Sequence, residues 1–257
     1  MAINIDDVYQ KVLTLSSKEQ RGYITPQEFN ILVNKAQFEI FEDYFHDFKT
    51  TELKPQSDRI ESDDRELLEH KLHPFRMFKT VTIPTLPGSP QTVSYQDMAV
   101  GGHEVHYIEG VRLKEIGNPP AGWDDSFNPE IVPMSTKEFL DAQAHPFTKA
   151  TNIRPVFERI GQDAIKIWPG PGVDQYWGVT FNTYRKPVQA KWGYVVVRGR
   201  ALYNNNPTFS TDLELHASEE ELVVAKVLQF AGVAINKQEL IGVGGGMEQQ
   251  IKQQKND

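Results

Sequence analysis

Two pairs of histidines have a spacing that metal ligands use. His70 and His73 are three residues apart, which places both imidazoles on one face if the segment is helical. His103 and His106 repeat this spacing, but the residues around them alternate as in a strand, where such an offset directs the rings to opposite faces. Structural metal sites need about four ligands, and neither pair has further ligands at a recognisable spacing. We therefore expect no metal site.

The glycine-rich run at 242–246 is a second candidate motif, because glycine backbones can surround a phosphate. No Gly-Lys-Ser/Thr sequence follows it, and it comes after a helical pattern and not after a strand, so a hinge is the better interpretation. The chain also lacks a Gly-x-Ser-x-Gly motif and has no cysteine, which excludes disulfides and thiolate chemistry. We expect no catalytic residue, no cofactor and no enzymatic activity from these patterns.

Charge and composition limit the classes of partner. The 257-residue chain has a formal net charge of -8, whereas general binding to nucleic acid requires clustered lysine and arginine. DNA can therefore be a neighbour without being a ligand. No apolar run approaches the roughly 20 residues that span a bilayer, and the N-terminal residues lack the pattern of a signal peptide. The sequence predicts a soluble protein without a membrane partner.

Residue types suited to protein contacts are concentrated in one tract. Arg185 and Lys186 precede a proline, and Trp192 and Tyr194 follow shortly after. Aromatic and arginine side chains are enriched at protein interfaces, although an ordinary sheet core explains aromatic residues equally well. We predict partner contacts at these four residues. We add Met247, where a polar C-terminal tail begins that we expect to become ordered on assembly.

Helical patterns occupy the first 75 residues. Thr25-Pro26-Gln27-Glu28 combines a capping threonine, a proline at the first helical position and a glutamate at the third. The apolar residues that follow at helical spacing predict a long helix: Phe29, Val33, Ala36, Ile40, Tyr44 and Phe48. Phe38, Phe41 and Phe45 widen this stripe into a broad aromatic face. Shorter helices are expected near 5–15 and 62–72.

From about residue 78 the pattern alternates, which predicts strands near 81–83, 93–95, 105–113 and 177–184 and a hairpin that turns at 161–163. A capping box at Ser135 predicts a short helix near 136–144. A further box at Ser218 precedes an apolar helix, 222–231, which we expect to be buried against the N-terminal helices. The sequence thus predicts an α+β protein, with a helical module formed by 1–75 and 211–257 and an inserted β-rich module with long loops at 76–210.

Three segments in this order resemble subunits of the head-to-tail connector, the adaptor or ring proteins, of podovirus-like tailed bacteriophages, including the crAss-like group. They are the opening stretch at 5–30, the tract from Tyr184-Arg185-Lys186-Pro187 to Lys191-Trp192-Gly193-Tyr194, and the ending from Asp212-Leu213-Glu214-Leu215-His216 to Ala231-Gly232-Val233. The region 53–175 carries little of the resemblance.

The resemblance implies a structural protein of the virion that is made in the host cytoplasm. Copies of the chain would form a homo-oligomeric ring between the portal and the tail, in contact with the portal and with neighbouring tail or ring proteins. DNA would pass through the ring without specific binding, which suits a negative net charge because acidic surfaces repel phosphate.

Two other functions stay open from the sequence. One is a virion-associated hydrolase whose carboxylates converge only in the fold. The other is a tail module that binds a receptor or glycan through exposed aromatic residues.

Overall fold

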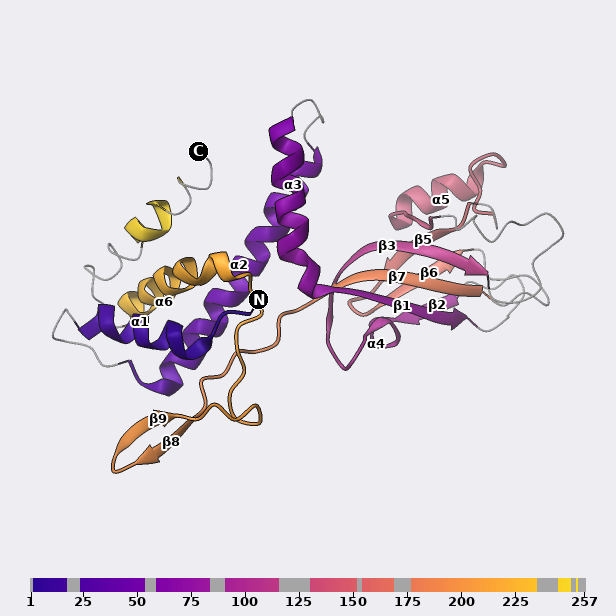
Figure 1. The fold of residues 1–257 in the computed structure, drawn as a ribbon. Coiled ribbons are helices and arrows are strands. Elements are labelled where there is room, and N and C mark those ends of the chain that lie inside the picture. The colour runs from indigo at the N-terminus through magenta and orange to yellow at the C-terminus, as the bar shows by residue number, and fades with distance from the viewer. Residues whose placement is uncertain are drawn as a thin grey trace. The chain divides into compact units, whose positions relative to one another are not determined.

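The computed structural model describes residues 2–17, 24–53, 59–83, 91–115, 130–151, 154–168, 177–234, 245–250 and 253 (Figure 1). The protein is α+β, as the sequence predicts. It divides into two units, of which unit 1 comprises 1–74 and 187–257 and unit 2 comprises 75–186. The glycines at 117–122, Trp123 and most of the glycine run at 242–246 lie outside the described residues.

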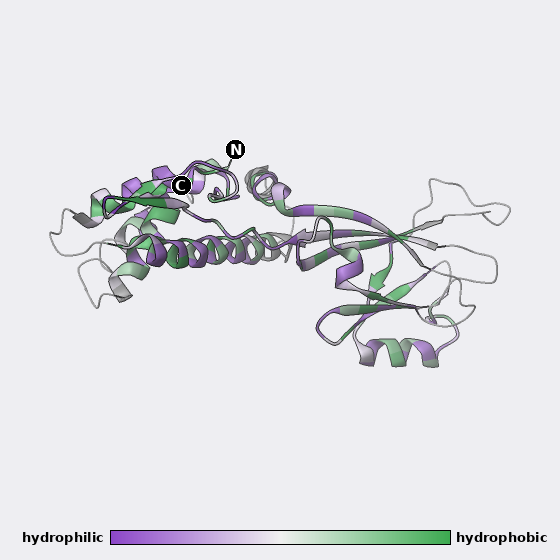
Figure 2. Ribbon diagram, turned by 90° about the horizontal axis from the view of Figure 1, so that it is seen from below, coloured by the Kyte–Doolittle hydropathy of each residue, from purple (hydrophilic) through white to green (hydrophobic). Residues whose placement is uncertain are grey.

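Unit 1 is built on helices from both ends of the chain. They are α1 (Ile5–Ser17), α2 (Pro26–Leu53), α3 (Arg59–Leu72) and α6 (Glu220–Ala234), followed by a helical segment at 245–250. The helix α6 contacts both α1 and α2, and an isolated bridge joins Ile3 to Leu213. The expected association of the two ends is therefore confirmed. Figure 2 shows hydrophobic and hydrophilic residues alternating along α2, as in a helix with one buried face.

The capping box that begins α2 is present. The Thr25 amide and hydroxyl donate to the Glu28 carboxylate at 3.0 and 2.8 Å, and the Glu28 amide donates to the Thr25 hydroxyl at 3.3 Å. At α6 the cap differs from the expected one at Ser218. A short 3-10 turn, Ala217–Glu219, precedes the helix, and the His216 ring caps this turn by accepting from the Ser218 amide. Glu219 is buried, where it pairs with Lys71.

Unit 2 contains two sheets. The first has the order β1-β7-β3, formed by Arg76–Ile83, Trp177–Arg185 and Val105–Glu115 in antiparallel pairing. The second has the order β2-β6-β5-β4, formed by Gln91–Ser94, Ala164–Trp168, Val156–Ile160 and Val132–Pro133, with β4 parallel to β5. The predicted turn at 161–163 joins β5 to β6.

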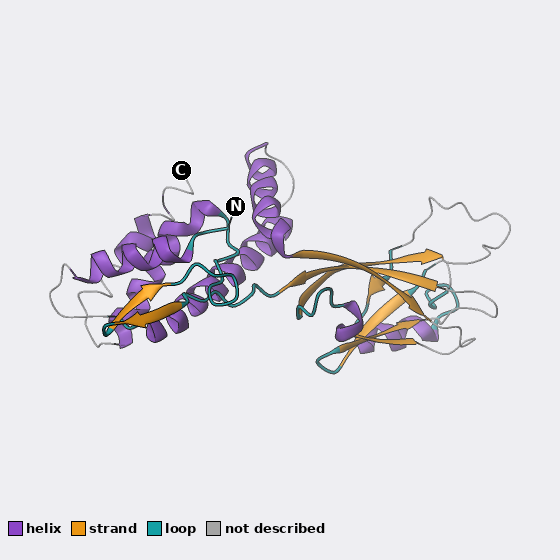
Figure 3. Ribbon diagram, turned by 60° about the horizontal axis from the view of Figure 1, so that its bottom comes forward, coloured by secondary structure: helices purple, strands orange, loops and turns teal. Residues whose placement is uncertain are grey.

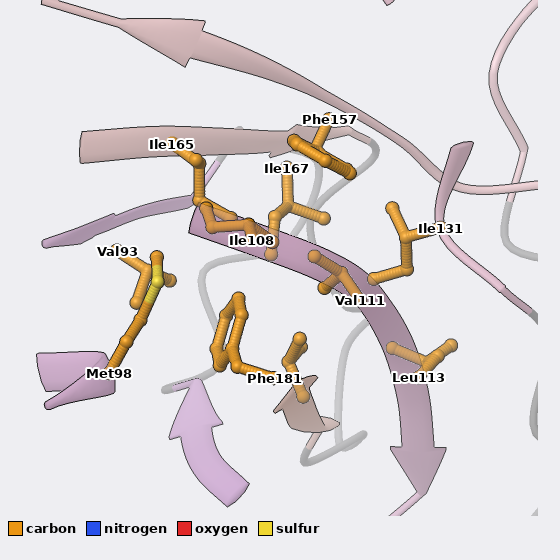
Figure 4. Packing of buried hydrophobic residues seen from close by; sticks show 11 residues of the cluster. Val93, Met98, Ile108, Val111, Leu113, Ile131, Phe157, Ile165, Ile167 and Phe181 are labelled. Carbon is orange, nitrogen blue, oxygen red and sulfur yellow. The ribbon is translucent and has the colours of Figure 1, made fainter. Parts of the chain in front are cut away.

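Side chains from both sheets form one core between them (Figure 4). Val111 and Phe181 come from the first sheet, Ile165 and Ile167 come from the second, and Met98 comes from the short helix α4 (Tyr95–Met98). The sequence predicted that the strand near 93–95 would include Tyr95, but the strand ends at Ser94. Ser94 begins α4 with its own capping box.

The helix α5 (Thr136–Ala144) covers the region predicted near 136–144, and its Ser135 and Glu138 form the expected capping box. Its Phe139 ring packs against Trp168 of β6, with ring centroids 5.0 Å apart. The strands β8 (Tyr194–Val197) and β9 (Arg200–Tyr203) form a two-stranded sheet and belong to unit 1.

The placement of 187–210 differs from the sequence interpretation, which assigned 76–210 to the β-rich module. In the structure this segment groups with the helices. The cause is long-range: polar side chains of α2 bind the backbone of 188–192, and the Trp192 ring packs on Tyr9 of α1. Neither interaction leaves a local pattern in the sequence.

Candidate functional site

The β8–β9 hairpin and the segments that hold it to the helices of unit 1 are the candidate site. The chain enters the hairpin through an extended segment at 187–193 and leaves it through 204–215, both drawn as loops in Figure 3. The two segments pair where Lys191 and Thr211 exchange backbone hydrogen bonds of 2.9 and 2.8 Å. The hairpin therefore extends from a connected base.

Asparagines on α2 fix the incoming segment. The Asn34 side chain donates to the carbonyl of Ala190 and accepts from its amide, both at 2.8 Å. Asn30 makes the same pair of bonds with Trp192, at 3.3 and 2.8 Å. Gln37 donates to the carbonyl of Val188 at 2.8 Å. The spacing of four and three residues puts these side chains on one face of the helix, where they form hydrogen bonds with backbone groups of the extended segment.

Trp192 packs in the core of unit 1 and anchors the base of the hairpin there. The side chain is 1% exposed, its ring lies 4.2 Å from that of Tyr9, and its indole N–H donates to Asp6 at 2.9 Å. Tyr194 of β8 and Tyr203 of β9 lie directly opposite each other in the hairpin. Their rings stack on Trp192, with distances between ring centroids of 5.7 and 5.8 Å. One end of the hairpin is thus held by three aromatic rings.

Gly193 allows the two segments to approach each other. A Cβ at this position would overlap the carbonyl of Phe209 and lie 2.7 Å from the Ser210 hydroxyl oxygen. The Gly193 amide donates to that hydroxyl at 3.1 Å, and the hydroxyl donates to the carbonyl of Asn204 at 2.5 Å. The Asn204 amide returns a bond to the Gly193 carbonyl at 2.9 Å. The base is therefore a closed hydrogen-bonded unit.

Beyond its base the hairpin exposes several apolar side chains. Register and alternation place Val195, Val197, Arg200 and Leu202 on one face, which we call the hairpin face. Val195 is 50% exposed, Leu202 is 53% exposed, and Val196 on the opposite face is 62% exposed. Isolated two-stranded hairpins are marginally stable in water, and contiguous exposed apolar residues mark interaction sites. The hairpin has the character of a contact surface.

The turn of the hairpin holds an arginine in a conformation that L-residues rarely adopt. Arg198 has a φ of 52° and Gly199 has a φ of 77°. Two-residue hairpins with positive φ at both central positions favour Asn or Gly at the first of them. An arginine there costs about 1 kcal/mol or more of backbone strain. Strain of this kind concentrates at functional positions.

The structure places the five predicted contact residues in different surroundings. Trp192 is buried, so it supports the hairpin from the core and offers no surface to a partner, which corrects its interpretation as a contact residue. Tyr194 is half-buried on that ring. Arg185, the last residue of β7, lies over the Phe75 ring at 5.8 Å. Lys186 forms an exposed ion pair of 2.8 Å with Glu104. Arg185 and Lys186 belong to unit 2, as do the residues that they contact. The sequence tract is thus divided between two units.

Met247, the fifth residue, lies in the helical segment 245–250 beside α1 and α6. It lines a cavity of about 510 Å³ together with residues of those helices, among them Lys11 and Val224. Glu248 of the same segment approaches the ammonium group of Lys226 at 3.4 Å. This part of the tail is therefore in contact with helices of unit 1 in the single chain.

Lys226 is a buried cation in an acidic surface. Its side chain is 1% exposed, and its ammonium nitrogen lies 2.6 Å from Glu39 and 3.6 Å from Asp43, both on α2. Burial lowers the pKa of Lys226, but the hydrogen bond to Glu39 and the charges of Glu248, Glu39 and Asp43 outweigh it, so that the pKa is raised. One positive charge faces three carboxylates, which leaves this surface negative.

Titratable residues also line a second cavity in unit 1, of about 590 Å³. His70, His73, Glu214 and His216 contribute to it, and the rings of His70 and His216 lie 5.6 Å apart. Burial, followed by the charge of His70, lowers the pKa of His216. The Glu214 carboxylate accepts the Val188 amide at 2.8 Å. Among the residues that the structure describes, no group of three His, Asp or Glu side chains could hold a metal ion.

The sequence interpretation missed the residues of the hairpin itself. The signal was present, because three consecutive valines precede Arg198-Gly199 and a second short apolar run follows. Two strand-forming runs separated by two residues that include glycine are typical of a hairpin.

No protein-family model and no curated protein sequence matches this chain. No helix within the described ranges has both the length and the hydropathy needed to cross a membrane.

Proposed function

We propose that the chain is a structural subunit that assembles with copies of itself into a closed ring. The observation that carries this proposal is the β8–β9 hairpin: a rigidly anchored base supports an apolar strand pair with no partner among the described residues. A cyclic ring needs two different complementary surfaces on each subunit. The hairpin supplies one such surface.

The position of the ring is proposed from the resemblance to head-to-tail connector proteins of podovirus-like phages. The subunit would sit between the portal and the tail of the virion, in contact with neighbouring tail proteins, and line the passage for DNA without binding it specifically. A net charge of -8 supports this role, since an acidic wall repels phosphate. The role requires neither a catalytic residue nor a cofactor.

Unit 2 has exposed apolar side chains that suit contacts with other proteins of a tail. Phe147, which follows α5, is 94% exposed, and Leu140 on α5 is 63% exposed. Scattered exposed apolar residues are normal on any protein surface, so these residues support the proposal less strongly than the hairpin does.

Electron microscopy tests this function. We expect negative-stain images of the purified chain to show rings with a central opening, and reconstructions of the phage particles to contain the same ring beneath the portal. A chain that is absent from purified particles would contradict the proposed virion role. Rings of the purified chain would then have to serve another purpose.

A further inference from the structure

The hairpin face combines apolar side chains with positive charge. Val195, Val197 and Leu202 are each about half exposed, and Arg200 lies directly opposite Val197. Arg198 adds a second cation at the turn, in its strained conformation. A surface of this composition fits a partner that is apolar in its centre and acidic at one end.

The helix α2 of unit 1 has those properties. Ile31 and Phe38 are 70% and 42% exposed, and their spacing of seven residues puts them on the same side of the helix. We call this pair the α2 stripe. Asn30 and Asn34 hold the segment 188–192 on one flank of the stripe, and α6 lies on the other, where Lys35 reaches over the Phe230 ring at 4.1 Å.

From Glu39 to its C-terminal end α2 is acidic, and we call this part of the helix the acidic half. Glu39 and Asp43 have side chains that are each 45% exposed, although they approach the buried ammonium of Lys226. Carboxylates outnumber lysines along the whole helix. A hairpin laid along the α2 stripe with its turn toward this half would place Arg198 and Arg200 near negative charge.

The two surfaces are of the same order of length. Val195 and Val197 are about 7 Å apart along a strand, and the two residues of the α2 stripe are about 10 Å apart along the helix axis. The acidic half begins with Glu39, the residue directly after Phe38. On the hairpin, Arg198 is the residue after Val197, and Arg200 lies opposite Val197 on β9.

We propose that the hairpin face of one copy docks on the α2 stripe of a second copy, with the hairpin arginines toward the acidic half of that helix. This inference rests on the proposed ring and specifies its contact. Both surfaces belong to unit 1 but differ from each other, so the contact is head-to-tail and can repeat around a ring. A contact between two hairpins would close with two copies and would leave the α2 stripe uncovered.

The absence of cysteine from the sequence permits a direct test by cross-linking. Two variants are prepared separately, Val197→Cys and Phe38→Cys, mixed, and treated with a short bismaleimide. Each chain then carries one thiol, so every cross-link joins two copies. We expect a cross-linked dimer from the mixture and little from either variant alone.

A mixture of Val197→Cys with Leu140→Cys is the matched control, because Leu140 is exposed but lies in unit 2. Efficient cross-linking of the Val197 variant to itself would overturn the proposal in favour of a hairpin-to-hairpin contact. Native mass spectrometry of the uncross-linked chain separates the two levels of inference. Rings without the mixed cross-link would refute this contact and leave the ring function, whereas a monomer would refute both.

Substitutions in the hairpin test the energetics of the same contact. Leu202→Ser is expected to weaken self-association by about tenfold, the size of one well-placed interface side chain, whereas Leu140→Ser is not. Arg198→Gly is expected to relieve the strained turn and raise the stability of the isolated chain while weakening association at low salt. If Arg198→Gly assembles as well as the parent chain does at low salt, the proposed role of the turn is wrong.

Discussion

Replacing Asn34 tests whether α2 holds the segment that carries the hairpin. Asn34→Ala removes two hydrogen bonds of 2.8 Å to Ala190, which is 1% exposed. Each bond contributes about 1 kcal/mol net, and a buried backbone group left without a partner costs about 1–3 kcal/mol. Asn34 itself is half-buried, so water can reach the gap and the lower end of that range applies. We expect a loss of about 2 kcal/mol.

The effect is measured by urea unfolding and by hydrogen exchange of the peptide that covers 188–192. Gln27→Ala is the matched control, because Gln27 is an exposed residue on the first turn of the same helix and its replacement should cost less than about 0.5 kcal/mol. Exchange at Ala190 should accelerate in the Asn34 variant alone. If both variants lose the same small amount and exchange is unchanged, the asparagines do not anchor the segment.

Three further changes probe unit 1. Lys226→Met leaves the carboxylates around it without their shared cation. Because these carboxylates are partly solvated, we expect the free energy of unfolding in urea to fall by about 1–2 kcal/mol and proteolysis at 245–250 to become faster. Unchanged proteolysis would contradict the pairing of Lys226 with Glu248. Gly193→Ala forces a Cβ against the carbonyl of Phe209, which should cost about 1–3 kcal/mol and loosen the hairpin base, as thermal unfolding and exchange can show. Because the pKa of His216 is lowered in the folded state, this histidine stabilises the fold above pH 6.5, and the effect is lost as the pH falls through the lowered value. His216→Asn should therefore make the free energy of unfolding depend less on pH on the acid side. If the pH dependence of the variant equals that of the parent, His216 does not cause it.

Local chemistry made much of the fold predictable. The capping boxes at Thr25 and Ser135 begin helices where expected, and the turn at 161–163 joins two strands. These features depend on residues within a few positions of one another. The burial of an almost entirely apolar α6 was also predictable, since no other arrangement covers such a helix.

The candidate site was harder to predict because long-range contacts create it. The bonds from Asn30 and Asn34 to the backbone span 162 and 156 residues, so nothing near those asparagines distinguishes them from surface residues. Trp192 shows the same difficulty, since a tryptophan serves a core and an interface equally well. In the structure Trp192 is buried in contact with Tyr9, and the valines at 195–197 of the hairpin are exposed instead.

The mass of the assembly formed by the purified full-length chain is the most direct measure of the central claim. We predict that native mass spectrometry gives a closed oligomer of one copy number, and that Leu202→Ser reduces its population while Leu140→Ser does not. A chain that stays monomeric throughout the micromolar range, with the hairpin variant indistinguishable from the parent, would contradict the claim that this protein works by assembling with itself.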